Sequence, residues 1–98
     1  MVKVGLLVRL VAKAGKEQAV AEFLAGALPL ARAEADTLTW YAIRISQNEF
    51  GIFDTFAADS GRKAHLNGPI AAALMANAAE LLSEPPRIES VDVLASKP

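Results

Sequence analysis

The stretch Val2-Lys-Val-Gly-Leu-Leu-Val-Arg-Leu-Val-Ala12 separates its side chains into two faces with a period of two. One face is entirely apolar, and it consists of Val2, Val4, Leu6, Val8 and Leu10. The other face is mixed, since Gly5, Leu7 and Val11 alternate with Lys3 and Arg9. This period predicts a β-strand whose apolar face meets a layer of helices. The mixed face is neither a solvent face nor a closed core, so we expect something to cover it in part.

The segments that follow predict the order β-α-β-β-α-β. Apolar residues three and four apart predict a helix over 16–32, with a kink or break at Pro29. Residues 37–46 and 50–56 are rich in β-branched and aromatic side chains and predict a hairpin through the polar turn 47–49. A short helix over 59–68, with Asp59 as N-cap and Gly68 as C-cap, precedes a helix from Pro69 to Leu82 and a strand over 87–95. We therefore expect one α+β domain over 1–98, a ferredoxin-like four-stranded antiparallel sheet with helices on one face.

Composition excludes several classes of protein. The 98 residues carry a formal net charge of −1 and no long basic run, so nucleic acid is not an expected partner. The chain has no cysteine and one histidine, so we expect neither disulfides nor a metal cluster, and no cofactor. The N-terminal segment has too many charges for a signal sequence or a membrane span, so we expect no membrane partner and a cytoplasmic location.

Four segments of this chain resemble the antibiotic-biosynthesis monooxygenase family of dimeric α+β barrel proteins. The most specific are Gly51-Ile-Phe-Asp-Thr-Phe56, with an acid in an aromatic strand, and Arg62-Lys-Ala-His-Leu-Asn-Gly68. The acidic turn Arg32-Ala-Glu-Ala-Asp-Thr-Leu38 and the final Ile88-Glu-Ser-Val-Asp-Val-Leu94 complete the likeness. Many relatives have Glu-Pro-Gly where this chain has Glu34-Ala35-Asp36, so the local backbone is expected to differ.

The resemblance implies a small homodimer in which two sheets pack face to face, with a pocket between sheet and helices in each subunit. Some members oxidise quinols or polyphenols with molecular oxygen and without a cofactor. Haem-degrading relatives use an Asn, Trp and His set, and the matching positions here hold Val8, His65 and Met75. These residues do not reproduce that set, so haem degradation is disfavoured.

His65 and Asp54 are the candidate catalytic residues. His65 matches the histidine of the family motif, and an imidazole both takes and gives a proton near neutral pH. It acts as a general base or holds a phenolate, or else it fixes a helix to the sheet as a structural residue. Asp54 shares a strand face with Ile52 and Phe56, so a buried carboxylate is expected. It orients His65 or binds a substrate hydroxyl, or it forms a salt bridge with Arg44 or Arg9.

Aromatic and basic side chains are the candidates for binding a planar substrate. Trp40 and Tyr41 are adjacent in a strand and point to opposite faces, so only one of them lines a given pocket. Arg44 or Arg9 could stabilise an oxyanion, and Phe53 and Met75 complete the expected lining, although a phenylalanine there is most simply a core residue.

Two functions stay open at this point. The first is a cofactor-independent monooxygenase that acts on a small quinol or polyphenol. The second is a non-catalytic dimer that binds a small apolar molecule or responds to stress, since one histidine and one aspartate suffice for binding. In both, the mixed sheet face of Gly5, Leu7 and Val11 forms the homodimer interface.

Overall fold

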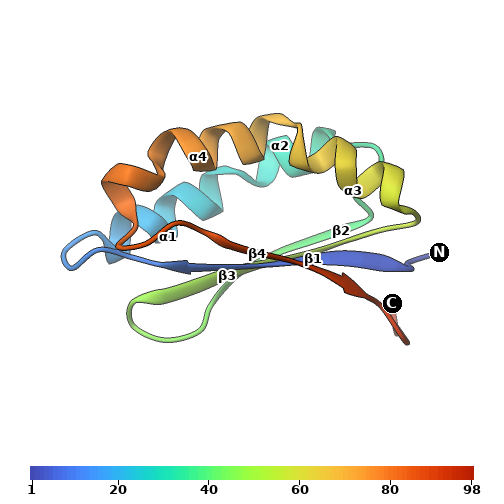
Figure 1. Cartoon of the computed structure of the whole chain (residues 1–98), viewed down its shortest axis with the longest axis horizontal. Coiled ribbons are helices and arrows are strands. Elements are labelled where there is room, and N and C mark those ends of the chain that lie inside the picture. Colours follow the sequence, from blue (N-terminus) through green and yellow to red (C-terminus); the bar gives the residue numbers. More distant parts are fainter.

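The computed structural model describes residues 1–98 and confirms the ferredoxin-like α+β fold. All helices lie on one face of a single antiparallel sheet (Figure 1). The elements, in chain order, are β1 (Val4–Val11), α1 (Glu17–Gly26), α2 (Leu28–Ala33), β2 (Thr39–Arg44), β3 (Glu49–Phe56), α3 (Asp59–Leu66), α4 (Pro69–Leu81) and β4 (Arg87–Asp92).

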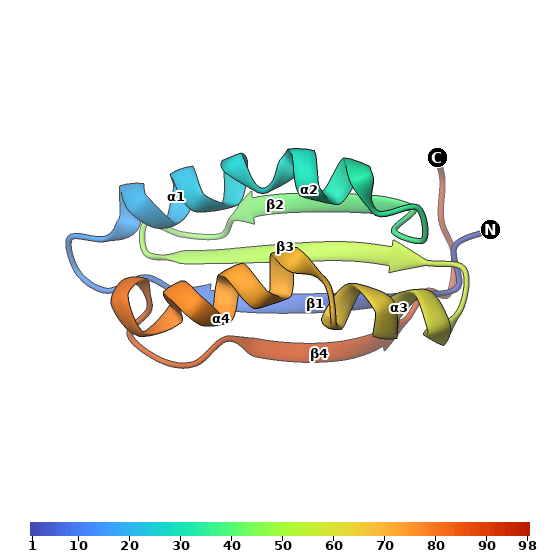
Figure 2. The same ribbon diagram turned by 90° about the horizontal axis from the view of Figure 1, so that it is seen from above.

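The sheet has the strand order β2-β3-β1-β4, so the first and third strands form its centre. Helices α1 and α2 run along the β2 side, and α4 and α3 run along the β1 and β4 side (Figure 2). Leu6 of β1 lies opposite Asp54 of β3 and Ser90 of β4, so these three residues lie on the same face of the sheet. Seen from above, β3 lies between the two pairs of helices (Figure 2).

The first helical segment breaks close to Pro29, as expected, but at Ala27 and not at the proline itself. Helix α1 ends at Gly26 and α2 begins at Leu28, so Pro29 occupies the first turn of a new helix. Proline has no N–H to donate to the preceding turn, and the first turn of a helix is where that absence costs least. The break lies two residues before the proline, so Pro29 stands in the first turn of α2, where an N–H donor is not required.

Two expected helix caps are wrong. The N-cap of α3 is Ala58, and Asp59 is the first helical residue, where its charge still favours the positive end of the helix. The C-cap of α3 is Asn67, and Gly68 is instead the N-cap residue of α4. Pro69 begins α4 as predicted.

The inner face of the sheet forms the core. Leu6, Val8 and Leu10 are buried under the helices, as their period predicts. The larger apolar cluster joins β1 and β3 to α1 and α4 and includes Phe50 and Leu74. Val2 and Val4, which were expected on the same face, are only half-buried because they lie at or before the start of β1.

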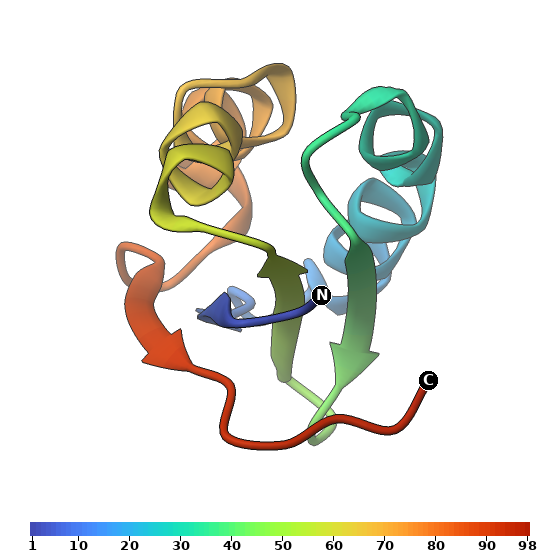
Figure 3. The ribbon, with the colours of Figure 1, turned by 90° about the vertical axis from the view of Figure 1, so that its right-hand side faces the viewer.

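Register decides which hairpin aromatic faces the helices. Trp40 lies opposite Asp54 on the inner face, and Tyr41 lies opposite Phe53 on the outer face, where it is 57% exposed. No helix covers this outer face, but the C-terminal segment runs beneath it (Figure 3). Tyr41, Phe53 and this segment border a hollow of about 660 Å³. None of the helices has the length and apolar character that a membrane crossing requires.

Candidate functional site

Asp54 is completely buried on the inner face of β3, with a relative exposure of 0%. The expected burial is confirmed, but the alternative pairing with an arginine is wrong. Arg44 lies four residues from Trp40 along β2, where it stacks on Phe50 and donates to backbone carbonyls of the turn. Arg9 points to the outer face, where Glu49 and Glu89 are its partners.

His65 of α3 is the partner of Asp54. The imidazole is 7% exposed and its Nε2 lies 2.9 Å from Oδ2 of Asp54. This contact is an ion pair, and neither oxygen of Asp54 accepts a hydrogen bond of regular geometry. The ring of Phe56 packs beside the imidazole at 5.6 Å between centroids. His65 therefore faces the sheet, as expected for the inner side of a short helix.

Glu34 contacts the other nitrogen of the same imidazole, and sequence reasoning missed it as a site residue. Its Oε1 lies 2.5 Å from Nδ1 of His65 and also accepts a hydrogen bond from the hydroxyl of Thr37 at 2.7 Å. Its second oxygen, Oε2, is buried without a partner. Glu34 is the C-cap residue of α2 and has an extended backbone conformation. The acidic turn of the family resemblance was the signal that could have identified it.

The two carboxylates change the protonation of His65. Burial alone lowers the pKa of an imidazole, because it disfavours the charged form. The interactions with Asp54 and Glu34 outweigh this effect and raise the pKa of His65 from 6.5 to about 9. The imidazole is therefore protonated at neutral pH, with a carboxylate on each nitrogen. We refer to Glu34, His65 and Asp54 as the carboxylate–histidine triad.

One cleft adjoins the triad and a second lies nearby. The first, of about 160 Å³, is lined by Glu34, Asp36, Thr37 and His65 together with glycines 61 and 68. A Cβ at Gly68 would lie 3.2 Å from Oε2 of Glu34, so glycine at this position leaves room beside the free carboxylate oxygen. The second cleft, of about 330 Å³, lies between α2 and the edge strand β2 and is lined by Trp40, Leu28 and Ala31. Thr37 lines both clefts, and no residue of the triad lines the second.

Trp40 contributes an unusual polar group to this region. Its ring packs against Ala27, Ala31 and Ile70, and its Nε1 is buried without a hydrogen-bond acceptor. Buried N–H donors are nearly always paired in proteins, so this group marks a place suited to an acceptor. Trp40 is thus the one predicted aromatic that lies beside the triad.

The structure does not bring the remaining predicted residues to the triad. Tyr41 and Phe53 lie on the outer face of the sheet. Arg44 borders a separate cleft with Phe50, and Met75 is 58% exposed on α4. No group of three His, Cys, Asp or Glu side chains is arranged to hold a metal ion, and both nitrogens of His65 face carboxylates.

Comparison with solved structures places this architecture in a known class of fold. A Nitrosomonas europaea protein proposed to be an antibiotic biosynthesis monooxygenase superimposes with a TM-score of 0.83 at 14% identity, over 94% of this chain and 90% of that one. A structure described as an antibiotic biosynthesis monooxygenase gives a TM-score of 0.80 at 10% identity, over 94% and 99% of the two chains. The fold is that of the antibiotic biosynthesis monooxygenases, as the resemblance implied.

A nearer relative has the same fold and a similar sequence. A protein of unknown function from Nitrosomonas europaea is 61% identical, with a TM-score of 0.97, over 99% of this chain and 94% of that chain. The chain belongs to the same family as this Nitrosomonas protein. No family model matches the chain, and no curated protein matches it.

Proposed function

We propose that the protein is a cofactor-independent monooxygenase that acts on a small electron-rich aromatic of the quinol or polyphenol type. The observation that carries this proposal is the buried carboxylate–histidine triad, with one cleft lined by Glu34 and His65 and a second cleft nearby that shares Thr37. The fold shared with antibiotic biosynthesis monooxygenases supports the same class of reaction.

The triad is suited to accept a proton from a phenol. With both acids ionised, two carboxylates and one imidazolium carry one net negative charge in a buried place. Transfer of a phenolic proton to the free oxygen of Glu34, a residue that lines the first cleft, neutralises the triad and leaves a phenolate. His65 was expected to accept this proton, but it is already protonated at neutral pH. In this mechanism His65 orients the two carboxylates and offsets their charge, and a carboxylate is the base.

The second cleft would hold the aromatic ring. Its position against Trp40 allows the substrate ring to stack on the indole, while a hydroxyl reaches past Thr37 toward Glu34.

The oxidation needs no external reductant. The phenolate gives one electron to O₂, and recombination forms a bond between a ring carbon and oxygen. Loss of the ring proton and cleavage of the O–O bond then leave one oxygen atom on the ring and release the other as water. In balance, a hydroquinone and O₂ give a hydroxyquinone and water, so all four electrons come from the substrate. The protein's part is to deprotonate the substrate and exclude water.

Oxygen uptake with a panel of hydroquinones and anthrones tests this proposal. We expect His65→Ala and Glu34→Gln to lower the rate at least about a hundredfold, in the range that acid–base groups contribute. Glu80→Gln is the matched control, since Glu80 lies near the end of α4 on the exposed surface. No uptake with any substrate, or equal rates for Glu34→Gln and Glu80→Gln, would contradict the proposal.

A binding protein without catalysis is the second candidate. The observation in its favour is that both nitrogens of His65 are engaged by carboxylates, which leaves the imidazole no free position. Quenching of Trp40 fluorescence by a quinol, without oxygen uptake and with recovery of the unchanged quinol, would select this function.

For either function we also propose a homodimer through the outer face of the sheet. Leu7, Tyr41 and Ile43 lie on this face, which no helix covers, and a second copy of the sheet would bury them. Leu7→Asp should give monomers or aggregates by light scattering, whereas Leu30→Asp on the helical layer should not. An unchanged dimer in Leu7→Asp would place the interface elsewhere.

A further inference from the structure

Helix α3 carries His65 but has little apolar surface with which to pack on the sheet. Its sequence is Asp-Ser-Gly-Arg-Lys-Ala-His-Leu, and its only buried residues are Gly61 and His65. Leu66, its one large apolar residue, is exposed. No side chain caps the N-terminus of the helix. Hydrophobic packing alone is therefore a weak means of fixing the position of this helix, and polar contacts must supply what it lacks.

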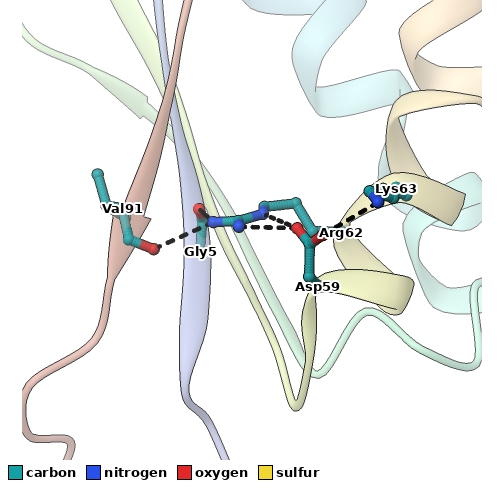
Figure 4. Close-up of polar contacts among 5 residues, drawn as sticks. All are labelled: Gly5, Asp59, Arg62, Lys63 and Val91. Atoms are coloured by element: carbon teal, nitrogen blue, oxygen red, sulfur yellow. Dashed lines mark hydrogen bonds and ion pairs between the residues drawn. The ribbon is translucent and has the colours of Figure 1, made fainter.

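Arg62 makes polar contacts that join α3 to two strands of the sheet (Figure 4). Its Nη1 donates to the carbonyl oxygen of Gly5 in β1 at 3.3 Å and to that of Val91 in β4 at 3.4 Å. The side chain is only 15% exposed, so water screens these bonds little. One guanidinium thus ties the first turns of α3 to two neighbouring strands.

Asp59 holds the guanidinium in the orientation that this contact requires. Its Oδ1 accepts from Nε of Arg62 at 3.0 Å and from Nη2 at 2.8 Å. Two donors on one oxygen fix the plane of the guanidinium and leave Nη1 to face the strands. Lys63 pairs with the same aspartate at 3.3 Å but is largely exposed and reaches no strand.

We propose that Arg62 is a positioning residue for the carboxylate–histidine triad. Arg62 and His65 are three residues apart and so lie on one face of α3. Arg62 fixes that face to β1 and β4, and His65 then reaches Asp54 on β3 and Glu34 after α2. This inference concerns the geometry of the triad and stands whether or not the protein is an oxygenase.

A direct effect of charge and an effect of position have opposite signs at His65. Loss of a nearby cation removes repulsion and raises the pKa of an imidazole. Loss of the contacts between Arg62 and the two strands instead moves His65 away from Asp54 and Glu34, whose interactions hold the pKa of His65 at about 9. Removal of Arg62 should therefore lower the pKa of His65 if Arg62 acts by position.

The test is an NMR titration of His65, which is the only histidine in the chain. We expect Arg62→Gln to move the pKa of His65 from about 9 toward its ordinary 6.5. Arg62→Lys should lower it less, because one ammonium keeps the charge but cannot bond Asp59 and both strands together. Lys63→Gln is the matched control: it removes the same charge from the next residue, and it should not lower the pKa.

Either of two results overturns the proposal. One is a pKa in Arg62→Gln that equals or exceeds that of the wild type, which would show that the arginine acts only by its charge. The other is an equal fall in Lys63→Gln, which would show that the fall in pKa does not depend on the contacts of Arg62 with the strands. Emission from Trp40 reports whether each variant is folded. If Arg62→Gln does not fold, Arg62→Lys decides, and a wild-type pKa in that variant overturns the proposal.

Discussion

The two ends of the layer between sheet and helices are built differently, although the same strands form both. At one end, Val8, Leu10 and Phe50 pack against α1 and α4 in a wholly apolar cluster. At the other end, β3 presents Asp54 to His65 of α3, and Glu34 closes the opposite side of the imidazole. Two residues after Ile52, the inner face of one strand therefore changes from apolar to charged.

We expect the apolar end to supply most of the stability of the fold and the polar end to supply the chemistry of the site. Burial of apolar side chains gives a free energy that does not depend on protonation. A buried imidazolium between two carboxylates contributes only while the imidazole is protonated. The apolar end should therefore hold the fold at every pH, whereas the polar end should respond to pH and to loss of any one partner.

The largest expected effect lies at the apolar end. Phe50→Ala should lower the free energy of unfolding by about 3–5 kcal/mol, because it removes a fully buried ring and leaves a cavity. Urea unfolding measures the loss, which should be the same at neutral pH and above the pKa of His65. A loss that changes with pH would mean that the two ends are not independent.

The pH dependence of wild-type stability comes next. The folded-state pKa of His65 is raised from 6.5 to about 9, so its contribution is complete below pH 6.5 and disappears as the pH rises through 9. The free energy of unfolding should fall by up to about 3 kcal/mol over this range. In His65→Gln, urea unfolding should show no such fall. An equal fall in the variant would assign the effect to other groups.

A smaller effect is expected at Thr37, which supports Glu34. Thr37→Val removes a hydroxyl donor to the carboxylate and should cost about 2 kcal/mol, because bonds to charged groups are the stronger ones. Thr39→Val is the control, since Thr39 shares its hydroxyl bond with the neutral Thr55 on the outer face. That loss should be at most about 1 kcal/mol. Equal losses by urea unfolding would remove the distinction between charged and neutral partners.

The smallest effect is expected at Arg9. Its ion pairs with Glu49 and Glu89 are long, at 4.0 and 3.9 Å, and partly exposed, so Arg9→Gln should cost less than about 0.5 kcal/mol. If Arg9 were instead the partner of Asp54, its loss would leave a buried charge unpaired and cost about 3 kcal/mol or more. A thermal unfolding curve distinguishes these outcomes.

Much of the fold could be predicted from the sequence because the deciding signals are local. The period of two in β1 and the neighbours of Asp54 in β3 each depend on a few adjacent residues. The break before Pro29 follows from the chemistry of one residue. The caps of α3 were harder to predict, because Asp59 and Gly68 are each common on both sides of a helix boundary. Residue type alone therefore does not decide the boundary.

The site could be predicted only in part because its contacts join distant segments. His65 and Asp54 were identified, but the partner of Asp54 was sought among arginines of the sheet. The pairing of Glu34 with His65 spans 31 residues and depends on how α2 ends relative to α3. The choice between Trp40 and Tyr41 needed the register of β2 on β3. Arg62 reads as a surface residue until its contacts with two strands are known.

The account depends most on the state of His65, and an NMR titration of the wild-type imidazole tests that state directly. With one histidine in the chain, the resonance needs no assignment by mutation. The carboxylate–histidine triad predicts a pKa of about 9 and an imidazolium at neutral pH. A pKa at or below 6.5 would mean that burial outweighs the two carboxylates, and that result would contradict the triad as described.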